Sequence, residues 1–321
     1  MANGDIRLRI GTRGSPLALW QAREVRARLL AAHRLPEEAV ELVVIKTSGD
    51  MIQDRALSQA GGKGLFTKEI DAAMLAGEID LAVHSAKDMP TAFPLGIDIV
   101  AYLPREDVRD ALISAKATSL ADLPEGAVVG TASLRRRALV KRLRPDVSTT
   151  LLRGNVETRL RKAESGEIHA TLLAIAGLKR LGLANRAAAI LDIHDFPPAV
   201  GQGAIAITAR PDDETAARAL APIACETTAT ALAAERAFLT VLDGSCRTPI
   251  AGHATLANGE ISFRGMLLRE DGSEFYEAHR AGSPADAALM GTDAAREILA
   301  RAPKDILAPK EILEPNGGSA H

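Results

Sequence analysis

The sequence has few of the residues that mark disulfide-rich, metal-binding or nucleic-acid-binding proteins. Its 321 residues include two cysteines, Cys225 and Cys246, and no CxxC or HExxH spacing. We therefore expect neither a disulfide framework nor a bound metal. Aromatic residues make up 3% of the chain and the formal net charge is −2. Both values argue against nucleic acid as a partner, because such surfaces are usually basic and hold single strands on aromatic rings.

Long apolar segments are also missing. No stretch of about 18 uninterrupted apolar residues occurs, and the amino-terminal sequence MANGDIRLRIGTRG lacks the apolar run of a signal peptide. We expect a cytoplasmic protein that does not bind a membrane. The content of 47% hydrophobic and 25% charged residues is typical of globular proteins, and the length fits two or three domains.

One stretch departs from the even balance of charge. Residues 130–160, GTASLRRRALVKRLRPDVSTTLLRGNVETRL, contain eight arginines and lysines against two acids. A local surplus of this size needs either a well-solvated face or an anionic partner. We favour the partner, because Ser133 and Asn155 are placed as N-caps of helices over 134–142 and 156–165, and capped helix starts beside arginines bind carboxylate or phosphate.

The cations of this stretch fall into two groups. Those on the outer helix faces are expected to be ordinary surface charges: Arg137, Lys141, Arg142 and Arg144. Those in or beside the first helical turns are expected to contact the ligand: Arg135, Arg136, Arg153 and Arg159.

The amino-terminal part of the chain predicts further site residues at strand ends. A strand over 6–11 is followed by Ser15 and Pro16, a strong helix start, so that Arg13 and Ser15 lie at a strand-to-helix junction. A buried strand over 79–84 leads into Ser85, Lys87 and Asp88, and ligands collect at the carboxyl ends of parallel strands.

Simpler interpretations exist for several of these residues. Lys87 and Asp88 can pair with each other at the surface, and His84 is expected to be a satisfied strand histidine. The polar, glycine-ended segment 47–64 is either a mobile lid that delivers Lys63 or an ordinary surface loop.

Strands that alternate with helices in two successive sets predict an α/β fold with two doubly wound lobes. A change of pattern after residue 212 predicts a small carboxyl-terminal α+β domain. We expect a discontinuous first domain of residues 1–103 plus 204–221, a second of 109–198 with the arginine-rich side of the cleft, and a third of 225–321. Cys246, in a predicted turn before Arg247, has the exposure and charge that favour a reactive thiolate, and a nucleophilic sulfur can also tether a prosthetic group.

Several segments together resemble one family. They are TRGSPLALWQA (12–22), GGKGLFTKEID (61–71), AVHSAKDMP (82–90), GTASLRR (130–136), LRGNVETRL (152–160), AGLKRLG (176–182), AVGQGAIAI (199–207) and GSCRTPIAG (244–252). In this order and over nearly the whole chain, they resemble the porphobilinogen deaminase (hydroxymethylbilane synthase) family. The resemblance implies a three-domain enzyme whose first two domains look like the lobes of periplasmic binding proteins.

The resemblance also implies a function. It implies a transferase of porphyrin and haem (tetrapyrrole) biosynthesis that joins four porphobilinogen molecules head to tail, with loss of ammonia, into hydroxymethylbilane. Cys246 matches the cysteine that holds a dipyrromethane cofactor in a thioether, and Asp88 matches the catalytic aspartate. We expect a monomer with porphobilinogen as its small-molecule partner.

The remaining family positions divide into two sets. Besides Cys246, the implied cofactor-binding residues are Lys87, Asp88, Thr131, Ser133, Arg135 and Arg136. The implied substrate-binding residues are Arg13, Ser15, Lys63, Ser85, Arg153, Arg159 and Arg180.

The chain departs from the family pattern at Ser245, where glycine is frequent, and at Cys225, where histidine is often found. Neither position carries the chemistry, although a second thiol makes the point of attachment ambiguous. Two other functions are compatible with parts of the sequence. A two-lobed binding protein for a small anion explains the arginines but not Cys246, and an RNA-binding protein is disfavoured by the few aromatic residues.

Overall fold

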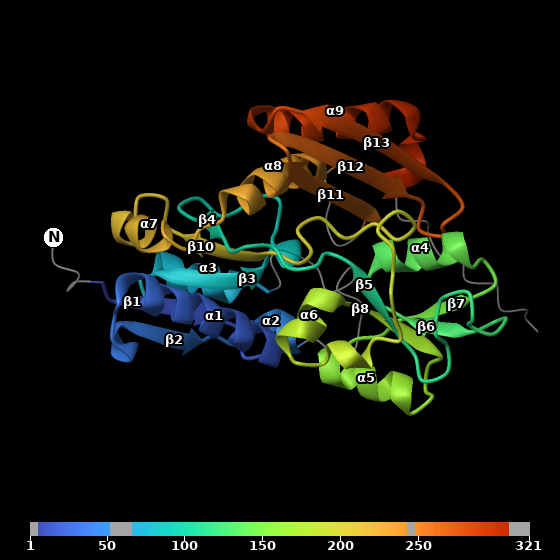
Figure 1. Ribbon diagram of the computed structural model, residues 1–321, viewed down its shortest axis with the longest axis horizontal. Helices are drawn as coiled ribbons and strands as arrows, with labels where there is room; N and C mark the ends of the chain where they lie inside the picture. Colours follow the sequence, from blue (N-terminus) through green and yellow to red (C-terminus); the bar gives the residue numbers. More distant parts are fainter. Residues whose placement is uncertain (1–5, 52–65, 243–247, 308–321) are drawn as a thin grey trace, which may run out of the picture.

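The computed structural model describes residues 6–51, 66–242 and 248–307, which form two α/β lobes and a smaller α+β unit (Figure 1). The first lobe is built on a five-stranded sheet of order β2-β1-β3-β10-β4. β1 pairs in parallel with β2 and β3, whereas β10 is antiparallel to β3 and β4. The strands are β1 (Leu8–Thr12), β2 (Val40–Val44), β3 (Leu81–Ser85), β4 (Asp98–Tyr102) and β10 (Ile205–Ala209). The helices are α1 (Pro16–His33), α2 (Ser48–Met51), α3 (Lys68–Leu75) and α7 (Glu214–Leu220).

Local signals explain where the first long helix begins and ends. The Ser15 hydroxyl accepts a hydrogen bond from the Ala18 amide, and Pro16 takes the first helical position. Arg34 ends α1 in the left-handed region, with φ of 53°. Buried Val25 and Leu29 of α1 pack on Ile10 of β1. The junction that carries Arg13 and Ser15 is therefore held by both a cap and the core.

The second lobe has the sheet order β7-β6-β8-β5-β9. β6 is parallel to β7 and β8, and β5 is antiparallel to β8 and β9. The strands are β5 (Asp110–Ile113), β6 (Val128–Gly130), β7 (Ser148–Thr150), β8 (Ala170–Ala174) and β9 (Ala189–Ile190). The helices are α4 (Leu134–Leu143), α5 (Val156–Glu164) and α6 (Ile175–Arg180). Ser133 and Asn155 cap α4 and α5 by accepting from the amides of Arg136 and Thr158, as the sequence predicts.

The third unit packs two helices on a three-stranded antiparallel sheet (Figure 1). It consists of α8 (Glu226–Val241), β11 (Ile250–Ala257), β12 (Glu260–Leu268), β13 (Phe275–Gly282) and α9 (Ala287–Arg301). Phe238 and Phe263 meet edge to face at 5.2 Å between ring centroids. Gly291 of α9 lies directly against the Ala234 carbonyl of α8, where a side chain would overlap that oxygen. The two helices thus approach at a point that only glycine permits.

The third unit packs against both lobes. Met89 and Tyr102 of the first lobe share a buried cluster with Phe238. Ala251 and Met266 of the third unit belong to the buried cluster of the second lobe. Short 3-10 turns lie at Glu37–Ala39, Ala86–Asp88, Ala184–Arg186, Pro284–Asp286 and Lys304–Leu307.

The predicted fold class, two α/β lobes with a small carboxyl-terminal α+β unit, is confirmed. One placement differs: Arg180, expected near the end of a strand, is the last residue of α6, which follows β8 directly. In the described part of the chain, no helix combines the length and apolar character that crossing a bilayer requires.

Candidate active site

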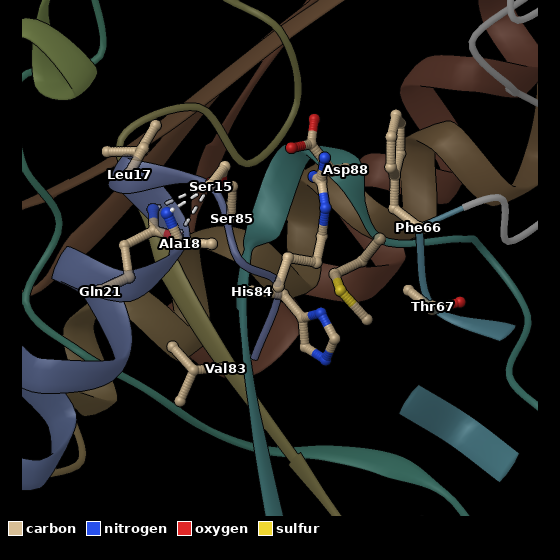
Figure 2. Close-up of a pocket in the computed structure, with 12 residues that line it drawn as sticks. Ser15, Leu17, Ala18, Gln21, Phe66, Thr67, Val83, His84, Ser85 and Asp88 are labelled. Carbon is tan, nitrogen blue, oxygen red and sulfur yellow. Dashed lines mark hydrogen bonds between the residues drawn. The ribbon is translucent and has the colours of Figure 1, made fainter. Parts of the chain in front are cut away.

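The first lobe contributes a small cavity of about 70 Å³ at the junction of β1 with α1 and at the end of β3 (Figure 2). Its polar lining includes Arg13, Ser15, Gln21, Ser85 and Asp88. Figure 2 shows the Asp88 carboxylate between the group of Ser15, Gln21 and Ser85 on one side and the Phe66 ring on the other. The predicted residues from two separate strand ends therefore meet at one place.

Two side-chain contacts hold polar groups of the cavity in place. The Gln21 amide donates to the Ser85 hydroxyl at 2.9 Å. The Arg13 guanidinium lies over the Phe66 ring, 4.1 Å from its centroid.

His84 closes the inner wall of the cavity and is not suited to proton transfer near neutral pH. Burial, reinforced by the charge of Arg13, lowers the pKa of His84 to about 4. Its Nε2 atom lies 3.3 Å from the Thr208 hydroxyl. The prediction of a satisfied strand histidine is confirmed.

Asp88 and Lys87 share a 3-10 turn but point to different surroundings. Asp88 is exposed, whereas Lys87 is half-buried and donates to Gln202 Oε1 at 3.3 Å. Burial, together with the charge of Arg136, lowers the pKa of Lys87 to about 8. Lys87 is therefore held by Gln202, whereas the Asp88 carboxylate stays open to the cavity.

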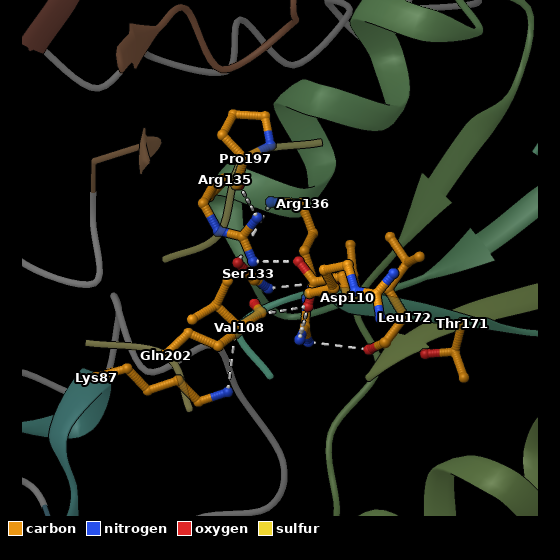
Figure 3. A network of polar contacts seen from close by, with 12 residues as sticks. Lys87, Val108, Asp110, Ser133, Arg135, Arg136, Thr171, Leu172, Pro197 and Gln202 are labelled. Atoms are coloured by element: carbon orange, nitrogen blue, oxygen red, sulfur yellow. Dashed lines mark hydrogen bonds and ion pairs between the residues drawn. The ribbon is translucent and has the colours of Figure 1, made fainter. Parts of the chain in front are cut away.

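The second lobe contributes a buried ionic network at the start of α4 (Figure 3). Arg135 Nη2 donates to Asp110 Oδ2 at 2.6 Å, and Arg136 Nη2 donates to Asp110 Oδ1 at 2.6 Å. The two arginines also donate to the carbonyls of Pro197 and Leu172. Because Asp110 is on β5 and the arginines are on α4, the carboxylate fixes the helix start to the sheet.

This network has more positive than negative charge. Burial opposes ionisation of Asp110, but the charges of Arg135 and Arg136 outweigh it and hold the pKa of that carboxyl far below its usual range. Burial lowers the pKa of Arg135, although Asp110 opposes the change. With Lys87 nearby, three cations face two carboxylates, Asp110 and Asp88.

The same network leaves one donor open. Arg135 Nε is buried and has no hydrogen-bond partner. An unfilled donor beside a surplus of buried positive charge fits a group that carries several carboxylates.

Two hydroxyls of the expected set are close to these arginines. The Ser133 hydroxyl is the cap of α4, and the buried Thr131 hydroxyl accepts from the Ser133 amide at 3.1 Å. Each hydroxyl oxygen therefore already accepts one hydrogen bond from a backbone amide, and its O–H group remains able to donate another.

The remaining arginines of the expected set, Arg153, Arg159 and Arg180, belong to the second lobe. Burial, together with the charge of Arg136, lowers the pKa of Arg159 to about 10, while Asp88 acts in the opposite direction. Arg153 also lowers it. Asp88 of the first lobe and Arg136 of the second are thus both close enough to Arg159 to influence its ionisation. Arg180 donates to the Gly203 carbonyl at 2.7 Å, beside the crossover back to the first lobe.

The cations expected to be ordinary make structural contacts. Arg137 pairs with Glu270 of the third unit at 2.7 Å, and Arg144 pairs with Asp146 at 2.6 Å. Lys141 donates to backbone carbonyls, and Arg142 lies 4.1 Å from the centroid of the Phe275 ring. All four therefore have partners within the protein, as expected of ordinary structural cations, and their separation from the ligand-contact group stays a prediction.

Two predicted residues, Lys63 and Cys246, lie outside the described residues. The other thiol, Cys225, occupies the N-cap position of α8, where its amide donates to the Tyr102 carbonyl at 2.8 Å. α8 has 16 residues and is therefore about 24 Å long. Cys225 precedes this helix in the sequence, and Cys246 follows it.

Sequence reasoning missed the buried partners of the site. Asp110 and Gln202 lie in the PREDVRD and GQG segments, which show only a charged run and a glycine turn. A second buried pair is an ion pair. Arg105, in the segment that leads from β4 to the second lobe, places its Nη1 atom 2.6 Å from Oε1 of Glu235 on α8.

Comparison with known proteins gives a consistent result. A family model described as porphobilinogen deaminase, dipyromethane cofactor binding domain, matches residues 8–218. A second, described as porphobilinogen deaminase, C-terminal domain, matches residues 229–300. Among solved structures, the periplasmic aliphatic sulphonate binding protein from Escherichia coli aligns with 74% of this chain and 70% of its own, at 18% identity and a TM-score of 0.40.

Two curated relatives are much more similar. The porphobilinogen deaminase of Nitrobacter hamburgensis is 58% identical over 298 residues, which cover 93% of this chain and 94% of the relative. That of Nitrobacter winogradskyi is 59% identical over 298 residues with the same coverage. The two family models together match residues 8–218 and 229–300, and each relative covers 93% of the chain, which therefore belongs to the porphobilinogen deaminase family.

Proposed function

We propose that the cleft between the two lobes carries out the reaction of this family. Four porphobilinogen molecules are joined head to tail, each with loss of ammonia, and hydroxymethylbilane is released. The observation that supports the assignment to this cleft is the exposed carboxylate of Asp88 in the first lobe, whose charge acts on Arg159 of the second.

Asp88 is the catalytic residue in this proposal. Positive charge develops on the pyrrole nitrogen when ammonia leaves. A nearby carboxylate stabilises that charge and accepts a hydrogen bond from the pyrrole N–H group. The exposed position of Asp88 at the end of its turn leaves both carboxylate oxygens available to the substrate.

The buried cations hold the cofactor. Lys87, Arg135 and Arg136 supply positive charge for its carboxylates, Thr131 and Ser133 supply hydroxyl donors, and Cys246 supplies the sulfur of the thioether. The dipyrromethane group, once attached, supplies the pyrrole carbon from which the product chain is extended. Asp110 keeps the two arginines in place before and after loading.

The remaining cations bind the substrate and the growing product. Each pyrrole ring carries an acetate and a propionate, so that a longer product requires more positive charge. The residues assigned to this role are Arg13, Ser15, Lys63, Ser85, Arg153, Arg159 and Arg180. A neutral His84 beneath them adds no competing proton donor.

We further propose that the functional domains are residues 1–103 with 204–221, 109–198 and 225–321. The enzyme is proposed to act as a cytoplasmic monomer that binds neither nucleic acid nor membrane. Sedimentation at several concentrations tests the monomer, which a mass that rises with concentration contradicts.

The intact mass of the purified protein tests the chemistry. A mass excess equal to two linked pyrrole units is expected in the parent chain and in Cys225→Ala, and is expected to be absent in Cys246→Ala. Cys225→Ala is the matched control, because its thiol is on the other side of α8 in the sequence.

An unmodified parent is incubated with porphobilinogen and weighed again. If no adduct forms and no porphobilinogen is consumed, the deaminase function is refuted and an anion-binding protein without catalysis becomes the better description. An adduct that persists in Cys246→Ala but disappears in Cys225→Ala refutes the assigned point of attachment.

A further inference from the structure

Gln202 has a fully buried side chain between the two lobes, and all of its polar atoms are paired (Figure 3). Its Nε2 atom donates to the Val108 carbonyl at 2.7 Å and to Asp110 Oδ1 at 3.1 Å. Its Oε1 atom accepts from Lys87 Nζ at 3.3 Å. Because Val108 O and the Asp110 carboxylate are acceptors only, the amide has one allowed orientation, and its oxygen must face Lys87.

The backbone around Gln202 is equally constrained. Gly201 and Gly203 have φ angles of +74° and +87°, which favour glycine. A methyl group at Gly201 would lie 3.0 Å from the Lys87 amide nitrogen. The Gln202 carbonyl accepts from Arg105 Nε at 2.9 Å. The segment around Gln202, which returns the chain to the first lobe, therefore packs closely against the turn of Lys87. It is also hydrogen-bonded to Arg105, in the segment that leads to the second lobe.

We propose that Gln202 is a positioning residue for the reaction: its amide oxygen, fixed by Val108 and Asp110, aims the Lys87 amine toward the carboxylates held in the cleft. The inference rests on the proposed function for what Lys87 binds. The contact itself is independent of that function, because it joins residues of this chain alone.

Lys87 has few other means of support. The charged groups that act on it are Arg136, Asp88, Asp110 and Arg135, of which two repel its ammonium. Gln202 Oε1 is the acceptor that holds its amine within the described structure. Removal of the Gln202 oxygen leaves the flexible Lys87 side chain beside two arginines without its acceptor. Both the direction of the Lys87 amine and its protonation then change.

The first test measures the titration of the Lys87 amine by its rate of acetylation at several pH values, in the full chain with Cys246→Ala so that no cofactor is attached. The midpoint is expected at about 8 in this background. Gln202→Met, which keeps the length and removes the acceptor, is expected to lower the midpoint by about one pH unit, and Gln202→Glu to raise it by about one or more. Thr171→Val is the matched control, because it removes a buried 2.8 Å bond to the Gly130 carbonyl in the second lobe and leaves Lys87 untouched.

The second test measures turnover of porphobilinogen with Cys246 intact. Gln202→Met is expected to lower kcat about 10-fold to 100-fold with KM changed less than about twofold. The double variant Lys87→Met/Gln202→Met is expected to be no slower than Lys87→Met, because both changes remove the same contact.

Two results overturn the proposal: a midpoint in Gln202→Met equal to the parent value, or single-variant losses that multiply in the double variant. If Gln202→Met does not fold, Gln202→Glu decides, and an unchanged midpoint in it refutes the positioning role. A parent that consumes no porphobilinogen refutes the proposed function, whereas the titration still decides the role of Gln202.

Discussion

Replacement of Glu235 by alanine is expected to destabilise the junction of all three units. Glu235 is on α8, and its side chain is completely buried. It accepts from Arg105 Nη1 at 2.6 Å and Nη2 at 3.0 Å, and from the amides of Gly201 at 2.7 Å and Ala254 at 2.8 Å. One carboxylate thus joins both crossovers between the lobes to β11.

The magnitude follows from what Glu235→Ala leaves behind. The Arg105 side chain is 11% exposed, and a buried charge without its partner costs about 3 to 5 kcal/mol. The two orphaned amides add about 1 to 3 kcal/mol each if water does not reach them. We expect a loss of at least about 5 kcal/mol, which at about 2 °C per kcal/mol lowers Tm by about 10 °C.

Thermal unfolding followed by circular dichroism measures this loss. Glu277→Ala is the control, because Glu277 pairs with Arg264 at 2.8 Å in the same unit but is 34% exposed, and such pairs contribute about 1 kcal/mol or less. Equal Tm shifts in the two variants would refute the reasoning. Arg105→Met/Glu235→Gln removes both charges and is expected to be more stable than Glu235→Ala.

Four further predictions concern single positions. Asp88→Asn is expected to lower kcat at least about 100-fold and to change unfolding free energy by less than about 0.5 kcal/mol, since Asp88 is exposed; an active, folded variant contradicts its catalytic role. Asp110→Asn leaves two buried arginines without a counterion and is expected to lower the free energy of unfolding, measured with urea, by about 3 to 5 kcal/mol. An unchanged free energy of unfolding would contradict the interpretation that Asp110 balances a surplus of buried positive charge. The folded chain keeps His84 neutral down to about pH 4, while the unfolded chain binds the proton below about pH 6.5. The free energy of unfolding is therefore expected to decrease by up to about 3 kcal/mol as the pH is lowered from about 6.5 to about 4, and His84→Gln should remove this pH dependence. Gly291→Ala, which overlaps Ala234 O, is expected to cost about 1 to 3 kcal/mol or more, whereas Gly177→Ala, with its nearest atom at 3.6 Å, should be neutral or stabilising; equal Tm values for the two contradict the packing argument.

The elements that the sequence predicted correctly depend on local signals. Ser15, Ser133 and Asn155 cap the helices at the predicted residues, because a cap needs only an oxygen within three residues of the helix start. The alternation of short apolar strands with helices was sufficient for the fold class.

The buried polar partners could not be predicted in the same way. Gln202 and Asp110 are 92 positions apart, and no periodicity relates them. Their meeting depends on the two chain segments that cross between the lobes, one just before β5 and one just before β10, which are hydrogen-bonded to each other. The sequence therefore offers candidates for the cations that bind the ligand, but it does not predict which groups hold those cations in place.

The placement of β10 has a consequence for how the chain folds as it is made. β10 lies between β3 and β4, yet the whole second lobe is synthesised before it. Because the chain is synthesised at about 5 to 20 residues per second, β3 and β4 each have an unpaired edge for roughly 5 to 20 s before β10 is made. The second lobe has all its strands by Ile190 and is free to fold during this wait. The first lobe emerges first but completes its sheet only after the second lobe has all its strands, so chaperone binding to the nascent chain is expected to concentrate on the first lobe.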